Sequence, residues 1–256
     1  MHIPAKRLIQ TVDYSKKIFR WFFDLIFPPR CLGCRQYLNE RPIEYLCKAC
    51  GHTIKIKRSF ECIECKAPSI LGLPCPLCRR TAAIDQLLIA ADFNDPLVER
   101  LIKTYKYKFI PEIALPLGRI LTQYITFLNI NKSYGIFRDN PLIMPVPLHP
   151  YRLHWRGFNQ SGILAKQLAN SYQMEWTDEV LMRKRRTPPQ ATAENREIRL
   201  ANINGLFTCR QYHRIEGRPI LLIDDVCTSG ATLNGCAEIL KRHGASSVCA
   251  LVVARG

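Results

Sequence analysis

The arrangement of the cysteines constrains this chain more than any other feature of its sequence. Eight of the twelve cysteines lie between residues 31 and 78 and form four Cys-x-x-Cys pairs. The pairs are Cys31/Cys34, Cys47/Cys50, Cys62/Cys65 and Cys75/Cys78. Each Cys-x-x-Cys turn presents two thiolates on one knuckle, and two knuckles complete a tetrahedral zinc site. The fourfold repeat of this spacing therefore predicts two structural zinc sites rather than disulfides.

The sequence leaves open which knuckles share a metal ion. Consecutive pairing, with gaps of twelve residues between Cys34 and Cys47 and nine between Cys65 and Cys75, suits ribbon hairpins, and interleaved pairing is also compatible. Residues 28–84 are irregular and rich in proline, and they bury too little apolar surface to fold unaided. We therefore predict a zinc-binding module at 28–84 that contains two structural zinc ions. Redox-active dithiols or unligated cysteines are the weaker alternative, because the spacing occurs four times.

The charge of the chain favours an anionic partner. The formal net charge is +16, which suits a phosphate-rich ligand, a nucleic acid or a membrane surface. Residues 1–27 combine basic side chains with the stretch "WFFDLIF", and we expect an amphipathic helix there. The apolar side of this helix would dock on the protein's own core or, alternatively, lie on an anionic membrane surface.

The sequence also bears on the location of the protein. Neither a signal peptide nor a membrane-spanning helix is expected near the N-terminus, because the apolar runs are short and no small-residue cleavage site follows them. Free thiols persist in reducing compartments. We therefore expect a cytoplasmic protein, with peripheral contact at the inner membrane as an alternative.

From residue 85 onward, segments with strand and helix patterns alternate. Apolar runs predict strands at 85–93, 141–148, 174–183, 219–224 and 247–253. Amphipathic spacing predicts helices at 95–108, with Asp95 as N-cap, and at 112–129, 160–172 and 230–243. Residues 149–160 and 184–205 are expected to be loops. Parallel strands need such crossover helices, so we predict an α/β domain at 85–256 with a mostly parallel sheet flanked by helices.

The stretch "LLIDDVCTSGAT" at 221–232 is the candidate binding site of this domain. Asp224 and Asp225 follow an apolar strand, at the carboxyl edge where open α/β sheets bind ligands, and their carboxylates suit the vicinal hydroxyls of a ribose. Small residues then lead into a helix, whose first N–H groups and neighbouring hydroxyls suit a phosphate. These residues are Thr228, Ser229, Gly230, Ala231 and Thr232. Together the two parts describe a site for a ribose 5-phosphate.

The same stretch resembles the phosphoribosyl pyrophosphate (PRPP) signature of type I phosphoribosyltransferases. The resemblance implies that Asp224 and Asp225 hold the ribose hydroxyls and stabilise positive charge on the sugar during catalysis, while 228–232 hold the 5-phosphate. Further stretches, "LIKTYKYK", "PVPLHPYRLHWRGFNQ", "RRTPPQ" and "RLANINGLF", extend the likeness over most of the chain. With the cysteine-rich region, they make the chain resemble the ComF/GntX family, in which a zinc region precedes a phosphoribosyltransferase-type domain.

The resemblance also assigns groups to the pyrophosphate of PRPP. Arg152 and Arg156 lie where the family has its pyrophosphate loop, and Arg186 lies on the long loop that closes over the ligand in relatives. Arginine suits bidentate contacts with phosphate. Magnesium would bridge the pyrophosphate and the ribose hydroxyls. The alternative for each arginine is a solvated basic surface.

Two functions of different classes follow from the resemblance. The first is a competence protein that binds PRPP and handles single-stranded DNA during natural transformation, with competence-machinery proteins as further partners. Basic residues of the zinc module, such as Lys55, Arg79 and Arg80, would contact the DNA backbone. The alternative is that the module is only a structural brace or a protein-docking surface. The second is a metabolic phosphoribosyltransferase, amidophosphoribosyltransferase-like or of salvage type, that transfers the ribosyl 5-phosphate to a small nitrogen nucleophile. No acceptor pocket is evident in the sequence, so PRPP binding is expected more strongly than transfer.

Overall fold

The computed structural model describes residues 28–38, 44–130, 139–184 and 206–256. Contacts divide the chain into two compact units, Met1–His52 and Thr53–Gly256. The first unit contains the first two Cys-x-x-Cys pairs and most of the short helix α2 (Lys48–Thr53). The second unit contains the last two pairs together with the α/β sheet, so the predicted boundary near residue 84 lies inside it. The helix predicted at 1–27 lies outside the described residues.

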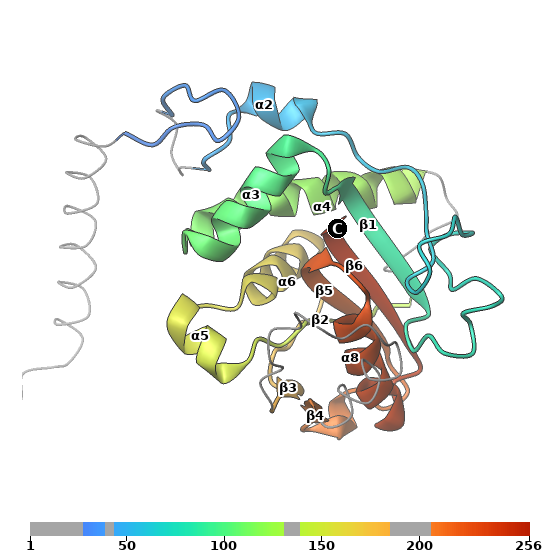
Figure 1. The fold of residues 1–256 in the computed structure, drawn as a ribbon. Helices are drawn as coiled ribbons and strands as arrows, with labels where there is room; N and C mark the ends of the chain where they lie inside the picture. Colours follow the sequence, from blue (N-terminus) through green and yellow to red (C-terminus); the bar gives the residue numbers. More distant parts are fainter. Residues whose placement is uncertain (1–27, 39–43, 131–138, 185–205) are drawn as a thin grey trace, which may run out of the picture. The chain divides into compact units, whose positions relative to one another are not determined.

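Four parallel strands form the main sheet of the second unit, in the order β1-β6-β5-β2 (Figure 1). They are β1 (Gln86–Asp92), β6 (Ser247–Arg255), β5 (Pro219–Cys227) and β2 (Leu142–Pro145). Most of their residues are buried, as expected for parallel strands that are covered on both faces. This arrangement confirms the predicted mostly parallel sheet.

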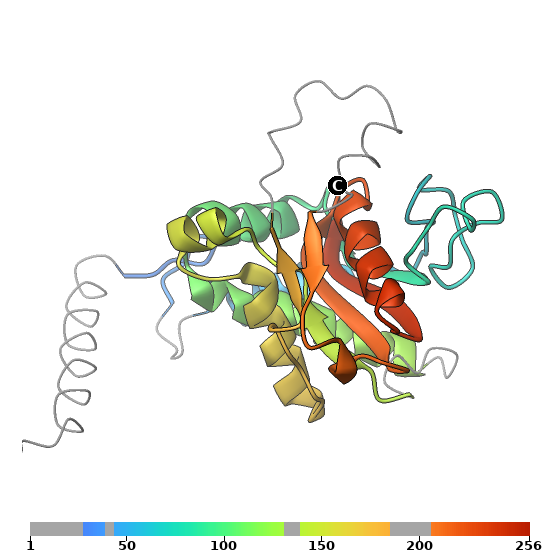
Figure 2. The same ribbon diagram turned by 90° about the horizontal axis from the view of Figure 1, so that it is seen from below.

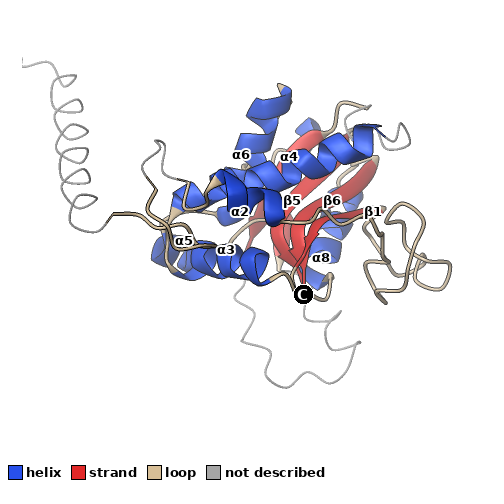
Figure 3. Ribbon diagram, turned by 90° about the horizontal axis from the view of Figure 1, so that it is seen from above, coloured by secondary structure: helices blue, strands red, loops and turns tan. Residues whose placement is uncertain are grey.

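Helices cover both faces of the sheet, as Figure 2 and Figure 3 show. The helices are α3 (Pro96–Tyr107), α4 (Ala114–Ile130, after the short 3-10 helix η1 at Pro111–Ile113), α6 (Gln160–Tyr172) and α8 (Ala231–Arg242). Helix α8 packs its buried Leu233 and Leu240 with Ile220 and Leu222 of β5, while α3, α4 and α6 lie on the opposite face. Across the described residues, no helix has both the length and the apolar character needed to cross a membrane.

Several predicted helix boundaries are confirmed. The carboxylate of Asp95 accepts hydrogen bonds from the N–H groups of Leu97 and Val98, at 2.8 and 3.3 Å, and so caps the start of α3. Helix α6 occupies the predicted range. Within α3, the buried Tyr105 donates its hydroxyl hydrogen to the carbonyl of Gln160 at 2.9 Å, and this bond ties α3 to the start of α6.

Other predictions were wrong in part. The expected loop at 149–160 contains helix α5 (Pro150–Arg156). The His149 ring accepts from the N–H of Tyr151, proline occupies the first helical position, and Gly157 ends the helix with φ 78. Since prolines and basic residues dominate this stretch, its helical pattern is weak.

The strand predicted at 174–183 is also shorter than expected. Only β3 (Leu181–Arg183) forms there, and it pairs antiparallel with β4 (Phe207–Cys209), a strand the sequence did not indicate. Trp176 contributes a single bridge to Ile143 of β2. A second 3-10 helix, η2 (Tyr212–Arg214), leads from β4 towards β5.

Candidate functional site

The site predicted at Asp224 and Asp225 lies where β5 extends beyond its neighbour β2. Pairing between these strands ends at Pro145 and Ile223, whereas β6 continues to pair with β5 as far as Cys227. Pro145 and Pro147 have no N–H group, so they cannot prolong the ladder of β2. The predicted strand 219–224 therefore continues to Cys227, and the two acids occupy an open edge at the carboxyl ends of the strands.

Each of the two acids has a partner within the protein. The hydroxyl of Ser161 donates to Oδ1 of Asp224 at 2.6 Å, and the same oxygen accepts from the N–H of Asp225 at 2.9 Å. Nζ of Lys106 lies 2.9 Å from Oδ1 of Asp225. Asp225 is only 5% exposed, whereas Asp224 is partly exposed. Asp224 is thus the more accessible of the two carboxylates.

Asp224 has an unusual protonation equilibrium. Its burial and the nearby charge of Asp225 raise its pKa to about 7, although Ser161 and Lys106 oppose the shift. Two adjacent carboxylates with little contact to water resist simultaneous ionisation. A ligand that brings hydroxyl donors or a cation to this edge would favour the ionised form of Asp224.

Two arginine side chains are within electrostatic range of the acid pair. Burial and the charge of Arg152 lower the pKa of Arg156, and the charge of Asp225 opposes this effect. Burial and Arg152 likewise lower the pKa of Arg183, and Asp224 opposes it. The structure therefore brings both predicted arginines of α5 into electrostatic range of the acid pair or of each other. The predicted Arg186 lies outside the described residues.

Three side chains at this edge were not predicted from the sequence, namely Ser161, Lys106 and Arg183. One signal existed for Lys106, because it lies one turn after the buried Ile102 on the apolar side of α3, where a lysine is unusual. Ser161 and Arg183 are ordinary polar residues of a helix and a strand. Only the tertiary structure brings them to the acid pair.

The predicted phosphate loop, residues 228–232, runs from the end of β5 into the first two residues of α8. Thr228 and Ser229 are exposed, and Gly230 is the N-cap of α8 with φ 75. The Ser229 hydroxyl lies 3.5 Å from the N–H of Ala231. The acids and the positive end of a 12-residue helix thus lie a few residues apart at one edge of the sheet.

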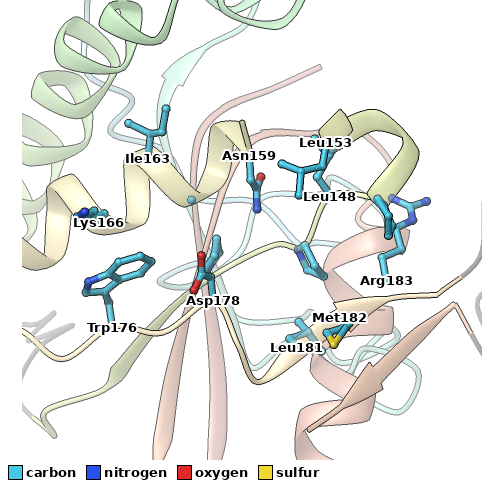
Figure 4. A pocket seen from close by; sticks show the side chains of 14 residues that line it. Leu148, Leu153, Asn159, Ile163, Lys166, Trp176, Asp178, Leu181, Met182 and Arg183 are labelled. Atoms are coloured by element: carbon cyan, nitrogen blue, oxygen red, sulfur yellow. The ribbon is translucent and has the colours of Figure 1, made fainter. Parts of the chain in front are cut away.

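A cavity of about 410 Å³ lies between the first turns of α5 and α6 and the segment 176–183 (Figure 4). Its walls are mainly apolar and include Pro145, Leu148, Ile163, Trp176, Leu181 and Met182. Asn159, Lys166, Asp178 and Arg183 add polar groups, and residues 224–232 do not line it. Arg183 is the residue of this lining that interacts electrostatically with Asp224.

The eight paired cysteines form two clusters. One contains Cys31, Cys34, Cys47 and Cys50, the other Cys62, Cys65, Cys75 and Cys78, and the sulfur atoms of each cluster lie within 4.8 Å of one another. The structure thus pairs consecutive knuckles, which the sequence left open. Sulfur atoms of neighbouring knuckles are 3.8 Å apart in the first cluster and 3.7 Å in the second, too far for disulfides.

The chemistry of both clusters fits a metal ion. Burial would raise the pKa of Cys31 and Cys62, but backbone N–H groups lower it to about 6 and about 7 respectively. Burial and the neighbouring thiols raise the pKa of Cys50 and Cys78 to about 12. Four thiolates at such distances need a cation among them, and four sulfur ligands are a typical structural zinc set. Zinc would cross-link the knuckles in each cluster.

Several known proteins are similar to this chain. Residues 156–256 match the family model of the phosphoribosyl transferase domain. The DNA utilization protein YhgH of Escherichia coli O157:H7 is 32% identical over 206 residues, which are 79% of this chain and 87% of that protein. Competence protein F of Haemophilus influenzae is 27% identical, over 86% of this chain and 93% of that protein. The solved glutamine PRPP amidotransferase from B. subtilis aligns with 59% of this chain and 30% of its own, with 16% identity and a TM-score of 0.38.

The raised pKa of Asp224 predicts how stability depends on pH. Because the folded state keeps a proton on Asp224 up to about pH 7 and the unfolded state loses it near pH 4, the free energy of unfolding should fall as pH rises between these values. Asp224→Asn should lack this fall. Urea denaturation of both proteins at several pH values measures the difference.

A second variant tests the cause of the shift. Ser161→Ala removes a hydrogen bond that favours the ionised carboxylate, so the pKa of Asp224 should rise further. The free energy of unfolding should then continue to fall to a higher pH than in the wild type. If the free energy of unfolding changed with pH in the same way in the wild type and in Asp224→Asn, the assignment of the raised pKa to Asp224 would be contradicted.

Proposed function

The chain belongs to the ComF/GntX family, and from this premise we propose that it binds PRPP at residues 224–232 and handles single-stranded DNA in natural transformation. The observation that carries the first part is the placement of an acid pair and a helix N-terminus at one open sheet edge. The match to the family model of the phosphoribosyl transferase domain, over residues 156–256, also includes this region of the chain. The names of the relatives support the second part, because they refer to DNA utilization and to competence.

The chemistry of the site suits the parts of PRPP separately. The ribose hydroxyls would donate to Asp224, the more exposed acid, while Lys106 holds Asp225 in place. The 5-phosphate would accept from the N–H groups at the start of α8 and from the hydroxyls of the loop. The acid on one side of the ribose and the N–H groups on the other then favour one orientation of the sugar, through charge as well as through hydrogen bonds.

The pyrophosphate would lie towards the cationic side chains. Arg156 of α5 is within electrostatic range of Asp225, and Arg152 of the same helix is within range of Arg156; such positive charge stabilises a pyrophosphate that leaves the anomeric carbon. Magnesium would be held by the pyrophosphate, the ribose hydroxyls and the acid pair, and would neutralise charge on the leaving group. Transfer to a nitrogen nucleophile is the chemistry that this arrangement would allow.

Binding of magnesium PRPP to the acid pair is directly testable. Asp224→Asn combined with Asp225→Asn removes the charged acceptors, so affinity should fall about 100-fold or more. Isothermal titration calorimetry of the wild type and the double variant measures this. Asp139→Asn, which changes an exposed acid outside residues 224–232 and outside the lining of the cavity beside Trp176, is the control and should bind as the wild type does. Equal affinity in all three proteins would exclude this location.

The second cysteine cluster offers a surface for single-stranded DNA. Lys66, Arg79 and Arg80 are exposed around it, and Ile70 and Leu77 are 78% and 92% exposed. Basic side chains beside exposed apolar groups suit a strand whose phosphates are bound by charge and whose bases contact apolar surface. Such binding needs no base-specific contacts.

Charge reversal tests this surface. Arg79→Glu with Arg80→Glu should weaken binding of a single-stranded oligonucleotide and should reduce the dependence of affinity on salt concentration. Arg100→Glu with Lys103→Glu makes the same change of net charge on the exposed side of α3 and should have a smaller effect. Fluorescence anisotropy over a series of salt concentrations measures both. Equal losses in the two variants would indicate attraction by overall charge alone.

A further inference from the structure

We infer that the second cysteine cluster, Cys62, Cys65, Cys75 and Cys78, holds the loop 228–232 in its ligand-binding shape, so that metal at the cluster and PRPP at the loop strengthen each other's binding. The identity of the ligand rests on the proposed function. The mechanical link between cluster and loop rests on contacts within the second compact unit.

The first contact joins the Cys62–Cys65 turn to the N-cap of α8. Ile63, within this turn, is fully buried in the core that also contains Leu233 and Cys227. A Cβ added to Gly230 would lie 2.7 Å from Cγ1 of Ile63 and 3.1 Å from its carbonyl oxygen. The turn therefore packs directly against the backbone of the loop, and only glycine allows so close an approach with φ 75.

The second contact is a buried arginine. The two guanidinium NH groups of Arg255 donate to the carbonyls of Cys62 and Ile63 at 2.8 and 2.6 Å, and Glu61 lies 3.3 Å from the same side chain. Arg255 is 6% exposed and pairs in register with Cys227, the residue before the loop. Charged hydrogen bonds in such a buried position are costly to break.

The third contact ties the first turn of α8 to both halves of the cluster. Oδ1 of Asn234 accepts from the N–H groups of Ala83 and Ile84 at 2.9 and 3.0 Å, just after the knuckle of Cys78. Nδ2 of the same side chain donates to Glu64 at 2.7 Å, within the knuckle of Cys62. Asn234 is 7% exposed, so it has little access to substitute partners in water.

These contacts depend on the cross-link between the two knuckles. The part of the chain between Cys65 and Cys75 is largely exposed and has few buried side chains of its own. Without metal, the two knuckles lose their cross-link, and Ile63 and Glu64, in the turn between Cys62 and Cys65, gain freedom to move. By linkage, a ligand that orders the loop must then also favour metal at the cluster.

The first cysteine cluster provides an internal control. It has the same four-sulfur composition, but it lies in the other compact unit, Met1–His52. Substitutions there remove one metal site and leave the contacts of Ile63, Arg255 and Asn234 unchanged. The two clusters can therefore be compared within one protein.

Affinity for magnesium PRPP tests the coupling in the full-length chain. Cys75→Ser with Cys78→Ser, and Cys47→Ser with Cys50→Ser, should each reduce the zinc content from two ions per chain to one. The second-cluster variant should bind magnesium PRPP about 5- to 150-fold more weakly than the wild type, the usual range of coupling between sites. The first-cluster variant should keep wild-type affinity. Equal affinity in both variants, or an equal loss, would overturn the inference.

Zinc release from the wild type tests the link without any substitution. Magnesium PRPP should slow the release of one of the two zinc ions to a coloured chelator and leave the other unchanged. Unchanged release of both ions from protein that demonstrably binds PRPP would refute the coupling.

Hydrogen exchange separates the coupling from the identity of the ligand. Amides of residues 229–236 should exchange faster in the second-cluster variant than in the first-cluster variant, even with no ligand present. If PRPP fails to bind the wild type but this difference appears, the link stands and the proposed ligand is wrong. Equal exchange in the two variants would show that the cluster does not support the loop.

Discussion

The unequal lengths of two neighbouring strands create the site on which this account depends. Strand β2 stops pairing at Pro145, and Pro147 has no N–H group to prolong the ladder, while β5 continues beside β6 to Cys227. The two acids of β5 therefore lie at an edge that no strand covers. Helices α3, α5 and α6 then contribute Lys106, Arg156 and Ser161 to the surroundings of these acids.

The second cysteine cluster belongs structurally to this site. The cluster is connected to β6 by Arg255, to the helix after the loop by Asn234 and to the loop itself by Ile63. A structural zinc site often stabilises a small domain that folds separately. Here its contacts lie behind residues 228–232, and this packing is the basis of the inferred coupling between metal and ligand.

The sequence predicted much of this architecture, because its signals were local. Apolar runs identified the strands, Asp95 identified the start of α3, and the acid pair followed by a small-residue turn identified the strand–loop–helix unit. Helix α5 was missed, because its prolines and basic residues resemble a loop. The contacts of Lys106 with Asp225 and of Arg255 with Cys62 join residues far apart in the chain, and no local pattern encodes them.

A crystal structure of the protein with ribose 5-phosphate would show directly whether residues 224–232 hold the ligand. We expect phosphate oxygens within hydrogen-bond distance of the N–H groups of residues 229–232 and a sugar hydroxyl that donates to Asp224. Ligand found only elsewhere, such as in the cavity beside Trp176, with residues 224–232 free of it, would contradict the account.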